Sequence, residues 1–565
     1  MEQLRFILLV ILVLTGYLLW KTWGDEHPPA SAPTAQEMYI PSATSASNLP
    51  ALAATQSSTE SNQKQTIAKN TVAPVSNNTE GQQIRVKTDV LDLVINSKGG
   101  DIVQAQLPQY PKVWDTPQDP VILFNNQDNT RYLANSILVG DNGFPSSLSQ
   151  QAVFTADSNS FQMEPGQNSL TVVLRWQGQG LAVDKEYVFH RGNYAVDVNY
   201  RIRNTATTQW QGNLYSQLMR VNNPTVEKNG FTHAYFGASL STADTSYKKI
   251  SFKDMDKLQQ NGEPLLSNPI VTKGWVAMQQ HYFLSAWVPP ADSNQHFYSQ
   301  VYPNNLYAIG MMGPQIVVAP GQDYTTQMKL YVGPEVNEQL QAVSPKLNLT
   351  IDYGFLWPIS TVFLWVMTRI YNILGNWGWS IVILTILIKL AFYKLSSMSY
   401  KSMAKMRELQ PKMLALKERF GDDKQKMSQA TMELYKSEKV NPLGGCLPIA
   451  VQVPFFIALY WVLAESVALR QAPFILWIHD LSLRDPYYIL PILMIITMFI
   501  QQKLSPTPPD PMQAKMMMVL PLVFGVLFMM FPAGLVLYWV VNNTVSILQQ
   551  WYITRNYEKS IHKRR

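Results

Sequence analysis

The chain changes character near residue 350, and this change constrains its fold more than any other feature. Beyond that point come several apolar runs of about 17 to 25 residues, the length that a helix needs to cross a bilayer. Before it, one N-terminal apolar run is followed by polar sequence. The mean hydropathy of -0.07 averages these two parts and describes neither. At 565 residues the chain is also too long for one ordinary domain. The sequence predicts an integral membrane protein with a large soluble domain.

Charge divides at the same place. Residues 351–565 hold 22 Lys and Arg against 12 Asp and Glu, a net charge of +10. The whole chain carries +6, so residues 1–350 carry -4. The basic residues lie mainly in loops between apolar runs, as in membrane proteins whose cytoplasmic loops are positive. Nucleic-acid binding would instead favour a compact basic domain with interleaved aromatic residues. The charge pattern therefore indicates membrane topology.

The N-terminal segment has two interpretations. Residues 4–20 are apolar, and Trp20 and Trp23 follow at the end of the run, where indole rings favour the membrane interface. A signal peptide cleaved near residues 30–32 is one interpretation, but this site lies about ten residues beyond the apolar run, where cleavage sites are not expected. An uncleaved signal anchor over residues 1–23 is favoured. Residues 24–83 are rich in Ser, Thr, Ala, Pro, Asn and Gln, which predicts a flexible linker.

Residues 84–350 show the pattern of antiparallel strands. In YAVDVNYRIR, residues 194–203, apolar and polar side chains alternate, and turn residues precede the segment. The simplest interpretation is an all-β sandwich. Its histidines show no metal-ligand spacing, and Cys446 is the only cysteine in the chain. We therefore expect no metal, no disulfide and no cofactor.

The region after residue 350 is predicted to be helical. If residues 355–375 and the next segment both spanned the membrane, the basic loop that follows would lie on the same side as the β domain, against the positive-inside rule. We therefore expect residues 355–375 to form an amphipathic helix in the outer interface. Including the N-terminal anchor, six spans are expected. The five later spans are residues 377–396, 445–464, 487–504, 516–531 and 534–553, joined by a cytoplasmic hairpin (397–443), an outer loop (465–486) and a cytoplasmic loop (505–515), and followed by a basic tail (554–565).

The cytoplasmic segment 397–443 is predicted to form a helical hairpin. Apolar residues recur at three- and four-residue spacing, Pro411 is expected to begin or kink the first helix, and Asp422 to cap the second. This apolar stripe has two interpretations: an adaptable surface that receives nascent hydrophobic segments, or packing between the two helices. Its residues are Met403, Met406, Met413, Leu416, Phe420, Met427 and Leu434.

A lysine interrupts the most apolar span. In TILIKLAFY, residues 385–393, Lys389 is surrounded by aliphatic residues, although an ammonium at the centre of a bilayer costs about 2.5 to 3.5 kcal/mol. The inner halves of the spans contain no acidic residue that could pair with it. Polar residues on three spans fall on one face of each helix and are expected to meet Lys389: Thr385, Gln452, Tyr538, Asn542 and Ser546.

These polar residues allow three interpretations. They could be hydrogen-bonding contacts between helices, each worth about 0.6 kcal/mol. Lys389 could snorkel partly to the inner surface. We favour the third, a hydrated cavity with an unpaired cation that is open to the cytoplasm. Such a cavity lacks the groups of an enzyme but suits the transient binding of a peptide with negative charge.

Several longer strings resemble one family. GNWGWSI, SMAKMRELQPKM, LGGCLPIAVQVPFFIALYWVL, RQAPFILWIHDLS, DPYYILPILM and FPAGLVLYWVVNNTVSILQQ are similar to the YidC membrane-protein insertases, and the resemblance covers nearly all of residues 350–555. It implies a non-enzymatic insertase of the bacterial inner membrane with both termini in the cytoplasm. It also implies a periplasmic β-supersandwich similar to sugar mutarotases, without sugar chemistry, and a hydrophilic groove open to cytoplasm and lipid.

The resemblance also implies site residues and partners. The basic residue of the groove corresponds to Lys389, where many members have arginine, and the substrate-contacting aromatic residue corresponds to Trp539, where others have tyrosine. Implied partners are nascent membrane proteins, the Sec translocon (SecYEG, SecDF), the ribosome, the signal recognition particle with its receptor, and the lipid bilayer. The alternative functions are a secondary transporter or channel with Lys389 as an ion site, and a structural periplasmic scaffold.

Overall fold

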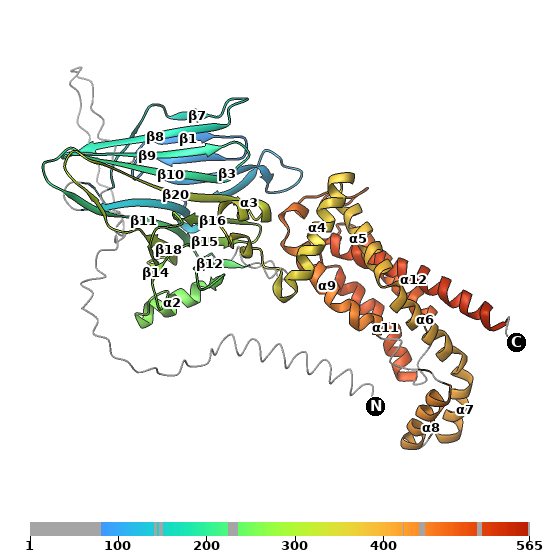
Figure 1. The fold of residues 1–565 in the computed structure, drawn as a ribbon. Coiled ribbons are helices and arrows are strands. Elements are labelled where there is room, and N and C mark those ends of the chain that lie inside the picture. The colour runs from blue at the N-terminus through green and yellow to red at the C-terminus, as the bar shows by residue number, and fades with distance from the viewer. Residues whose placement is uncertain are drawn as a thin grey trace, which may run out of the picture. The chain divides into compact units, whose positions relative to one another are not determined.

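The computed structural model describes residues 81–140, 144–145, 151–223, 235–421, 423–438, 440, 447–505 and 511–562. The expected N-terminal anchor and nearly all of the expected linker lie outside these residues. Strands dominate the blue-to-green part of the chain in Figure 1, and the helices α4 to α12 form the yellow-to-red part. The change of architecture falls near residue 350, as the sequence predicts.

The first sheet of the β domain is built from eleven strands. All of its pairs are antiparallel except β1 with β7. Two strands lie off the main path: β19 (Ile316–Val318) pairs with β11, and β4 (Pro120–Phe124) pairs with β3. The order along the main path is β14 (Ile270–Val271), β17 (Gln295–Tyr302), β18 (Leu306–Met312), β11 (Trp210–Val221), β5 (Tyr132–Gly140), β3 (Asp101–Pro111), β2 (Asp92–Asn96), β1 (Gln83–Lys87) and β7 (Ser160–Gln162).

The second sheet has nine strands, and each pair of neighbours is antiparallel. Its order is β13 (Lys248–Ile250), β12 (Phe236–Ser241), β15 (Trp275–Gln280), β16 (Phe283–Val288), β20 (Asp323–Pro334), β10 (Ala195–Asn204), β9 (Leu181–His190), β8 (Ser169–Gly178) and β6 (Thr155–Ala156).

The core of the β domain follows from alternation along the strands. In β10, Val196, Val198, Tyr200 and Ile202 are buried, and the residues between them are not, as the alternation over residues 194–203 predicts. Successive side chains of a strand point to opposite faces of its sheet, so one face of β10 joins the core.

Short helices complete the β domain. The helix α2 (Phe252–Asn261) begins with a capping box between Ser251 and Asp254 and ends at Gly262, whose φ of 66° suits a residue without a Cβ. The other short helices are η2 (Asp128–Thr130), α3 (Asn337–Val343), η3 (Leu347–Thr350) and η4 (Gly354–Leu356).

The helical part is organised around its last helix. The helix α12 packs against α5, α6 and α10, and α4 packs against α5 and α9. The elements are α4 (Trp357–Leu374), α5 (Trp377–Ala391), α6 (Tyr393–Glu408), α7 (Gln410–Phe420), α8 (Lys424–Ser437), α9 (Leu447–Glu465), η6 (Val467–Leu469), α10 (Ile489–Leu504), α11 (Pro511–Phe528) and α12 (Ala533–His562).

A membrane span needs a helix that is both long and apolar. Within the described residues, none of the helices meets both requirements by itself. The pair α5 and α6 meets them jointly, but its two helices are bent by 67° relative to each other.

Three local features differ from the expected boundaries. The expected span 377–396 is interrupted at Phe392, where α5 ends and α6 begins. The last helix continues to His562, beyond the expected end at residue 553. Asp423 caps α8 by accepting from the backbone N–H groups of Gln425 and Lys426, whereas the expected cap, Asp422, lies outside the described residues. Pro411 begins α7, as expected.

Candidate functional site

Lys389 lies in the last turn of α5, and its side chain is 5% exposed. Its Nζ donates to Oε1 of Gln452 on α9 at 3.1 Å and to Oγ of Ser546 on α12 at 2.7 Å. The polar faces that the sequence predicts on three separate helices therefore meet at this lysine. The sequence predicts this convergence because each polar residue falls on one side of its helix.

The partners of Lys389 are held by a second layer of hydrogen bonds. Gln452 Nε2 donates to Oδ1 of Asn542 and to the hydroxyl of Tyr538 at 3.4 Å. Ser546 Oγ donates its proton to the carbonyl oxygen of Asn542 at 2.7 Å. A hydroxyl has one proton and two lone pairs, so Ser546 can accept from the ammonium at the same time. The network fixes both acceptors toward Lys389.

The ammonium is bound by neutral groups. Among the described residues, none of the ion pairs involves Lys389. An amide oxygen and a hydroxyl supply dipoles but leave the positive charge uncompensated. Hydrogen bonds between two ions are stronger than those to neutral acceptors. A carboxylate that reached this position would therefore compete well with Gln452 and Ser546.

The space beside Lys389 is small in this structure. The hollow lined by Ile388, Lys389, Phe392, Leu395, Ser396, Val451 and Gln452 has a volume of about 10 Å³. That volume holds roughly one water molecule. A polypeptide segment therefore reaches Lys389 only after the surrounding helices move.

Two of the residues expected at the site lie outside this network. Thr385 is buried and donates to the carbonyl oxygen of Ile381, one turn earlier in its own helix, at 2.7 Å. The ring of Trp539 packs against Phe456 and Phe528, with centroid distances of 5.1 and 5.6 Å. Its Nε1 has no hydrogen-bond partner among the described residues. Trp539 thus belongs to an aromatic cluster beside the network.

One further contact to Lys389 comes from Gln549, which the sequence places on the same polar stripe of the last span as Tyr538, Asn542 and Ser546. Gln549 Nε2 donates to the backbone carbonyl oxygen of Lys389 at 3.3 Å. Gln549 follows Ser546 by three residues on α12, so its position on the polar face can be predicted from spacing. Its contact with a backbone group cannot, because it depends on where α5 ends.

The expected stripe of the cytoplasmic segment mostly faces inward. Met413 is buried, and the other six residues of the stripe are partly buried. Met403 and Met406 lie on α6, before the two hairpin helices α7 and α8. Two apolar residues outside the stripe are more accessible, since Leu414 is 56% and Met432 51% exposed. This burial is compatible with both interpretations of the stripe, so its role stays a prediction.

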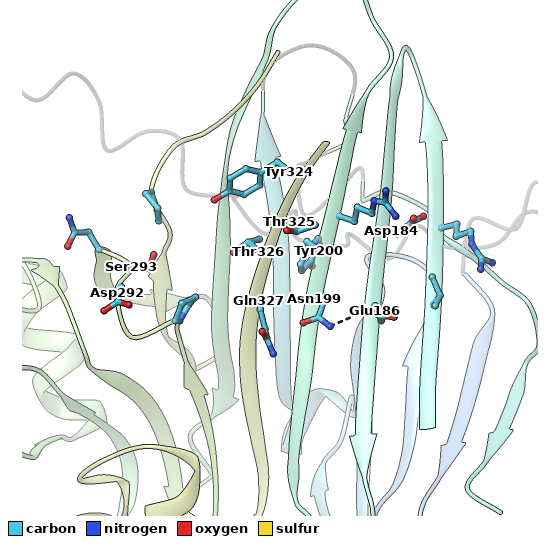
Figure 2. Close-up of a pocket in the computed structure, with 16 residues that line it drawn as sticks. Asp184, Glu186, Asn199, Tyr200, Asp292, Ser293, Tyr324, Thr325, Thr326 and Gln327 are labelled. Carbon is cyan, nitrogen blue, oxygen red and sulfur yellow. Dashed lines mark hydrogen bonds between the residues drawn. The ribbon is translucent and has the colours of Figure 1, made fainter. Parts of the chain in front are cut away.

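A larger hollow lies on the outer face of the second sheet (Figure 2). It has a volume of about 1040 Å³ and is lined by residues of β8, β9, β10 and β20 and by Pro290, Asp292, Ser293, Asn294 and Pro314. Arg175 pairs with Asp157 at 2.6 Å, and Arg201 pairs with Asp323 at 2.7 Å. Glu186 accepts from Asn199, as the dashed line shows. This polar lining does not suit a hydrophobic segment.

The chain combines a two-sheet β domain with apolar helices around a buried lysine, and its class, that of inner membrane proteins with a periplasmic domain, follows from the families that it matches. Two family models match the two parts: the YidC periplasmic domain over residues 83–366 and the 60Kd inner membrane protein over residues 369–560. The chain belongs to the YidC family of membrane protein insertases. The resemblance noted in the sequence is thereby confirmed.

Proteins similar to this chain over its full length are described as membrane protein insertases. The membrane protein insertase YidC of Pseudomonas fluorescens is 47% identical and covers 100% of both chains. That of Legionella pneumophila strain Corby is 49% identical over 99% of this chain and 98% of its own. A crystal structure described as an active YidC insertase with its first transmembrane domain resolved aligns with 84% of this chain and 95% of its own, at 16% identity and a TM-score of 0.39.

Proposed function

We propose that this insertase receives nascent hydrophobic segments in a positively charged groove at Lys389 and releases them into the inner membrane. The observation that carries the proposal is the buried ammonium of Lys389, held by two neutral acceptors on two other helices. A lysine kept for stability alone would be expected to have a carboxylate partner, since buried charges are normally paired.

The topology proposed for the chain has six spans. The N-terminal anchor, α5, α9, α10, α11 and α12 cross the membrane, and α4 lies in the outer interface. Both termini and the hairpin of α7 and α8 are then cytoplasmic, and the β domain is periplasmic. The positive charge of residues 351–565 supports this orientation because cytoplasmic loops carry excess Lys and Arg.

The first step is capture of the client by the hairpin. The exposed Leu414 and Met432 offer apolar surface, and unbranched methionines adapt to clients of different shape. The stripe residues on α7 and α8, Met413, Leu416, Phe420, Met427 and Leu434, are proposed to hold the two helices together beneath this surface. Capture on the cytoplasmic side brings the hydrophobic segment close to the groove.

The second step is entry of the polar flank of the client. An acidic flank replaces Gln452 or Ser546 as the partner of Lys389, because an ion pair in a site of low dielectric is stronger than a bond to a neutral acceptor. Asn542 and Tyr538 keep Gln452 in place while the flank exchanges. Thr385 and Trp539 are proposed to line the wall of the opened groove.

The third step is release into lipid between α5 and α12. Partitioning of the apolar segment into the bilayer drives this step. The membrane potential acts on the acidic flank in the same direction, with about 2.3 kcal/mol per charge at 100 mV. The proposed partners are nascent membrane proteins and, for clients that need them, the Sec translocon, the ribosome, and the signal recognition particle with its receptor.

The deciding experiment measures insertion of a small client with an acidic translocated tail in cells depleted of their own insertase. Lys389→Ala is expected to lower insertion at least about tenfold, which corresponds to about 1.4 kcal/mol. Lys389→Arg is expected to support insertion because it keeps the charge. Lys394→Ala, which removes an exposed lysine from α6, is the matched control and is expected to have no effect.

A second client with a neutral tail separates charge from folding. It is expected to insert with Lys389→Ala nearly as well as with the wild type. Normal insertion of the acidic client by Lys389→Ala would contradict the proposal. Ion flux into vesicles that requires Lys389 but no client would favour the transporter or channel instead.

A further inference from the structure

The bend between α5 and α6 has no cause in its own sequence. The two helices meet at Phe392 at an angle of 67°. Sharp kinks normally occur at Pro, at Gly, or where a side chain inserts into the backbone hydrogen-bond ladder. Residues 385–396 contain neither Pro nor Gly. An inserted side chain is therefore the cause to look for.

The backbone hydrogen bonds locate the interruption. The Phe392 N–H donates to the Ile388 carbonyl at 3.1 Å, and the Ser396 N–H donates to the Phe392 carbonyl at 3.0 Å. In a continuous helix the Lys389 carbonyl would accept from the Tyr393 N–H. The helix is interrupted at Phe392, in the turn that this bond would close. The carbonyl accepts from Gln549 Nε2.

The helix α12 thus contacts Lys389 twice, at its side-chain ammonium and at its backbone carbonyl oxygen. Ser546 binds its ammonium, and Gln549, three residues further along α12, binds its carbonyl oxygen. On α9, Phe455 packs edge-on against Phe392 at the bend, with ring centroids 4.9 Å apart. Two neighbouring helices therefore contact the point where α5 ends.

The position of Gln549 carries a free-energy cost for one of its own polar atoms. Its Oε1 is buried and has no hydrogen-bond partner among the described residues. A buried acceptor without a donor costs about 1 to 3 kcal/mol. A methionine of similar length would fill the same space without that cost, so packing alone does not explain a glutamine here.

We infer that Gln549 is a positioning residue that keeps the helix bent at Phe392 and thereby aims Lys389 at its partners. The bend matters for the site because Phe392, Leu395 and Ser396 line the same hollow as Lys389. A change of angle between α5 and α6 changes the width of that hollow. This inference rests on the proposed function of Lys389 for its consequence, but the bend itself can be measured without a client.

The test measures the bend in the full-length protein reconstituted in lipid. Spin labels at Trp379 on α5 and Lys401 on α6 report the distance across Phe392 in a Cys446→Ser background. A straight helix would separate these positions by about 33 Å, and the bend brings them closer. Gln549→Met keeps the side-chain length but removes the donor. It is expected to shift the distance toward the straight value or to broaden its distribution.

Gln550→Met is the matched control. Gln550 is the next residue of α12, and its Nε2 makes the same kind of bond, 2.9 Å long, to the carbonyl oxygen of Leu504 on α10. It is expected to leave the distance across Phe392 unchanged. If Gln549→Met does not give folded protein, Gln549→Glu takes its place, because an ionised carboxylate cannot donate.

The outcomes separate this inference from the proposed function. A wild-type distance distribution with the Gln549 variants would overturn the inference, whatever Lys389→Ala does to insertion. An equal shift with Gln550→Met would also overturn it, since the bend would then respond to any loss of a contact from α12. A shift with Gln549→Met alone, together with a loss of insertion of the acidic client, supports it.

Discussion

Two buried lysines show what distinguishes a structural charge from a functional one. Lys185 on β9 is fully buried and bonds to Asp101 on β3 at 3.3 Å, so the ion pair joins the two sheets. It also donates to the carbonyl oxygens of Gly99 and Ser136 at 3.1 Å each. Among the residues that the structure describes, the ammonium of Lys389 has only neutral partners. The first charge is compensated inside the fold, and the second remains able to attract an anion.

Removal of Lys185 tests this distinction. Lys185→Met is expected to lower the free energy of unfolding by about 3 to 5 kcal/mol, because Asp101 stays buried without its cation. The measurement is urea unfolding followed by tryptophan fluorescence. Arg175→Met is the control, since its pair with Asp157 is exposed, and it is expected to change stability by less than about 1 kcal/mol. Equal effects of the two variants would contradict the structural role of Lys185.

Glu335 makes the stability of the β domain depend on pH. Burial raises the pKa of its carboxyl from an ordinary value of 4.5 to about 8, against the opposing effect of a hydrogen bond from Gln279. The folded state thus keeps the proton to a higher pH than the unfolded state. This contribution to stability is complete below pH 4.5 and is lost as the pH rises toward 8.

Glu335→Gln is expected to remove this loss of stability at high pH, because glutamine has no carboxyl proton to lose. The variant should be more stable than the wild type at pH 8 by about 2 to 4 kcal/mol, since one pKa unit corresponds to about 1.4 kcal/mol. At pH 4 the two proteins should unfold at the same urea concentration. Glu338→Gln, at an exposed position of α3, should leave the pH profile unchanged. A parallel profile for Glu335→Gln and wild type would rule this explanation out.

At the scale of single residues, side-chain spacing along each helix predicts most of the residues that meet at Lys389. Lys389, Gln452, Tyr538, Asn542 and Ser546 form one network, as the polar faces of three helices indicate. Spacing could not predict whether a hydroxyl turns to its own backbone, as that of Thr385 does. It also could not predict the position of Trp539, because aromatic rings on several helices compete for the same contacts. Their roles in the groove stay predictions.

At the scale of elements, the sequence predicts helices better than it predicts their ends. Residues 377–396 read as one continuous helix because they contain no Pro and only Gly378, next to the start. The break at Phe392 lies beside the contact from Gln549 to the carbonyl oxygen of Lys389, two residues that are 160 positions apart in sequence. A local pattern cannot contain such information. Pro411, by contrast, acts within its own turn, and it begins α7 as predicted.

The exposed residues of the hairpin give a test of capture. Leu414→Ser with Met432→Ser is expected to lower photocrosslinking of a nascent client severalfold, because these side chains provide accessible apolar surface. The helical content should not change, since Met413 and the other inward residues remain. Lys412→Ser, an exposed polar change on α7, should have no effect. Undiminished crosslinking by the double variant would place client capture elsewhere.

At the scale of the whole molecule, the proposed spans are short. The helices α5, α10 and α11 contain 15, 16 and 18 residues. At about 1.5 Å per residue they reach about 22 to 27 Å, less than the hydrocarbon thickness of about 30 Å. A bilayer around such helices thins or the helices tilt, each at a modest cost. With these three helices as proposed spans, we expect a thin membrane to match the protein best.

Lipid thickness should accordingly control insertion. In reconstituted vesicles, the insertion of a client is expected to be faster in lipids with short acyl chains than in lipids with long chains, at equal protein content. The physical reason is that a thinner bilayer shortens the path of the polar flank through hydrocarbon. The Lys389→Ala variant serves as the background control. A rate that does not depend on chain length would argue against a role for short spans.

The division of the chain into a β domain and a helical part could be predicted, because period-two alternation and long apolar runs are local patterns. The order of strands could not. In the first sheet β11 lies between β5 and β18, which precede and follow it by many residues. Such pairings depend on how distant segments fit together in one core, and alternation alone is compatible with many orders.

The position of α12 in the sequence also has a consequence for the synthesis of the protein itself. Two of the groups that hold Lys389, Ser546 and Gln549, belong to α12, which is synthesised well after α5. Until that helix emerges, α5 has an ammonium and a backbone carbonyl that lack these partners. A newly made copy therefore passes through a stage in which α5 exists without two of the contacts that hold Lys389, and it gains them only after residues 546–549 have been made.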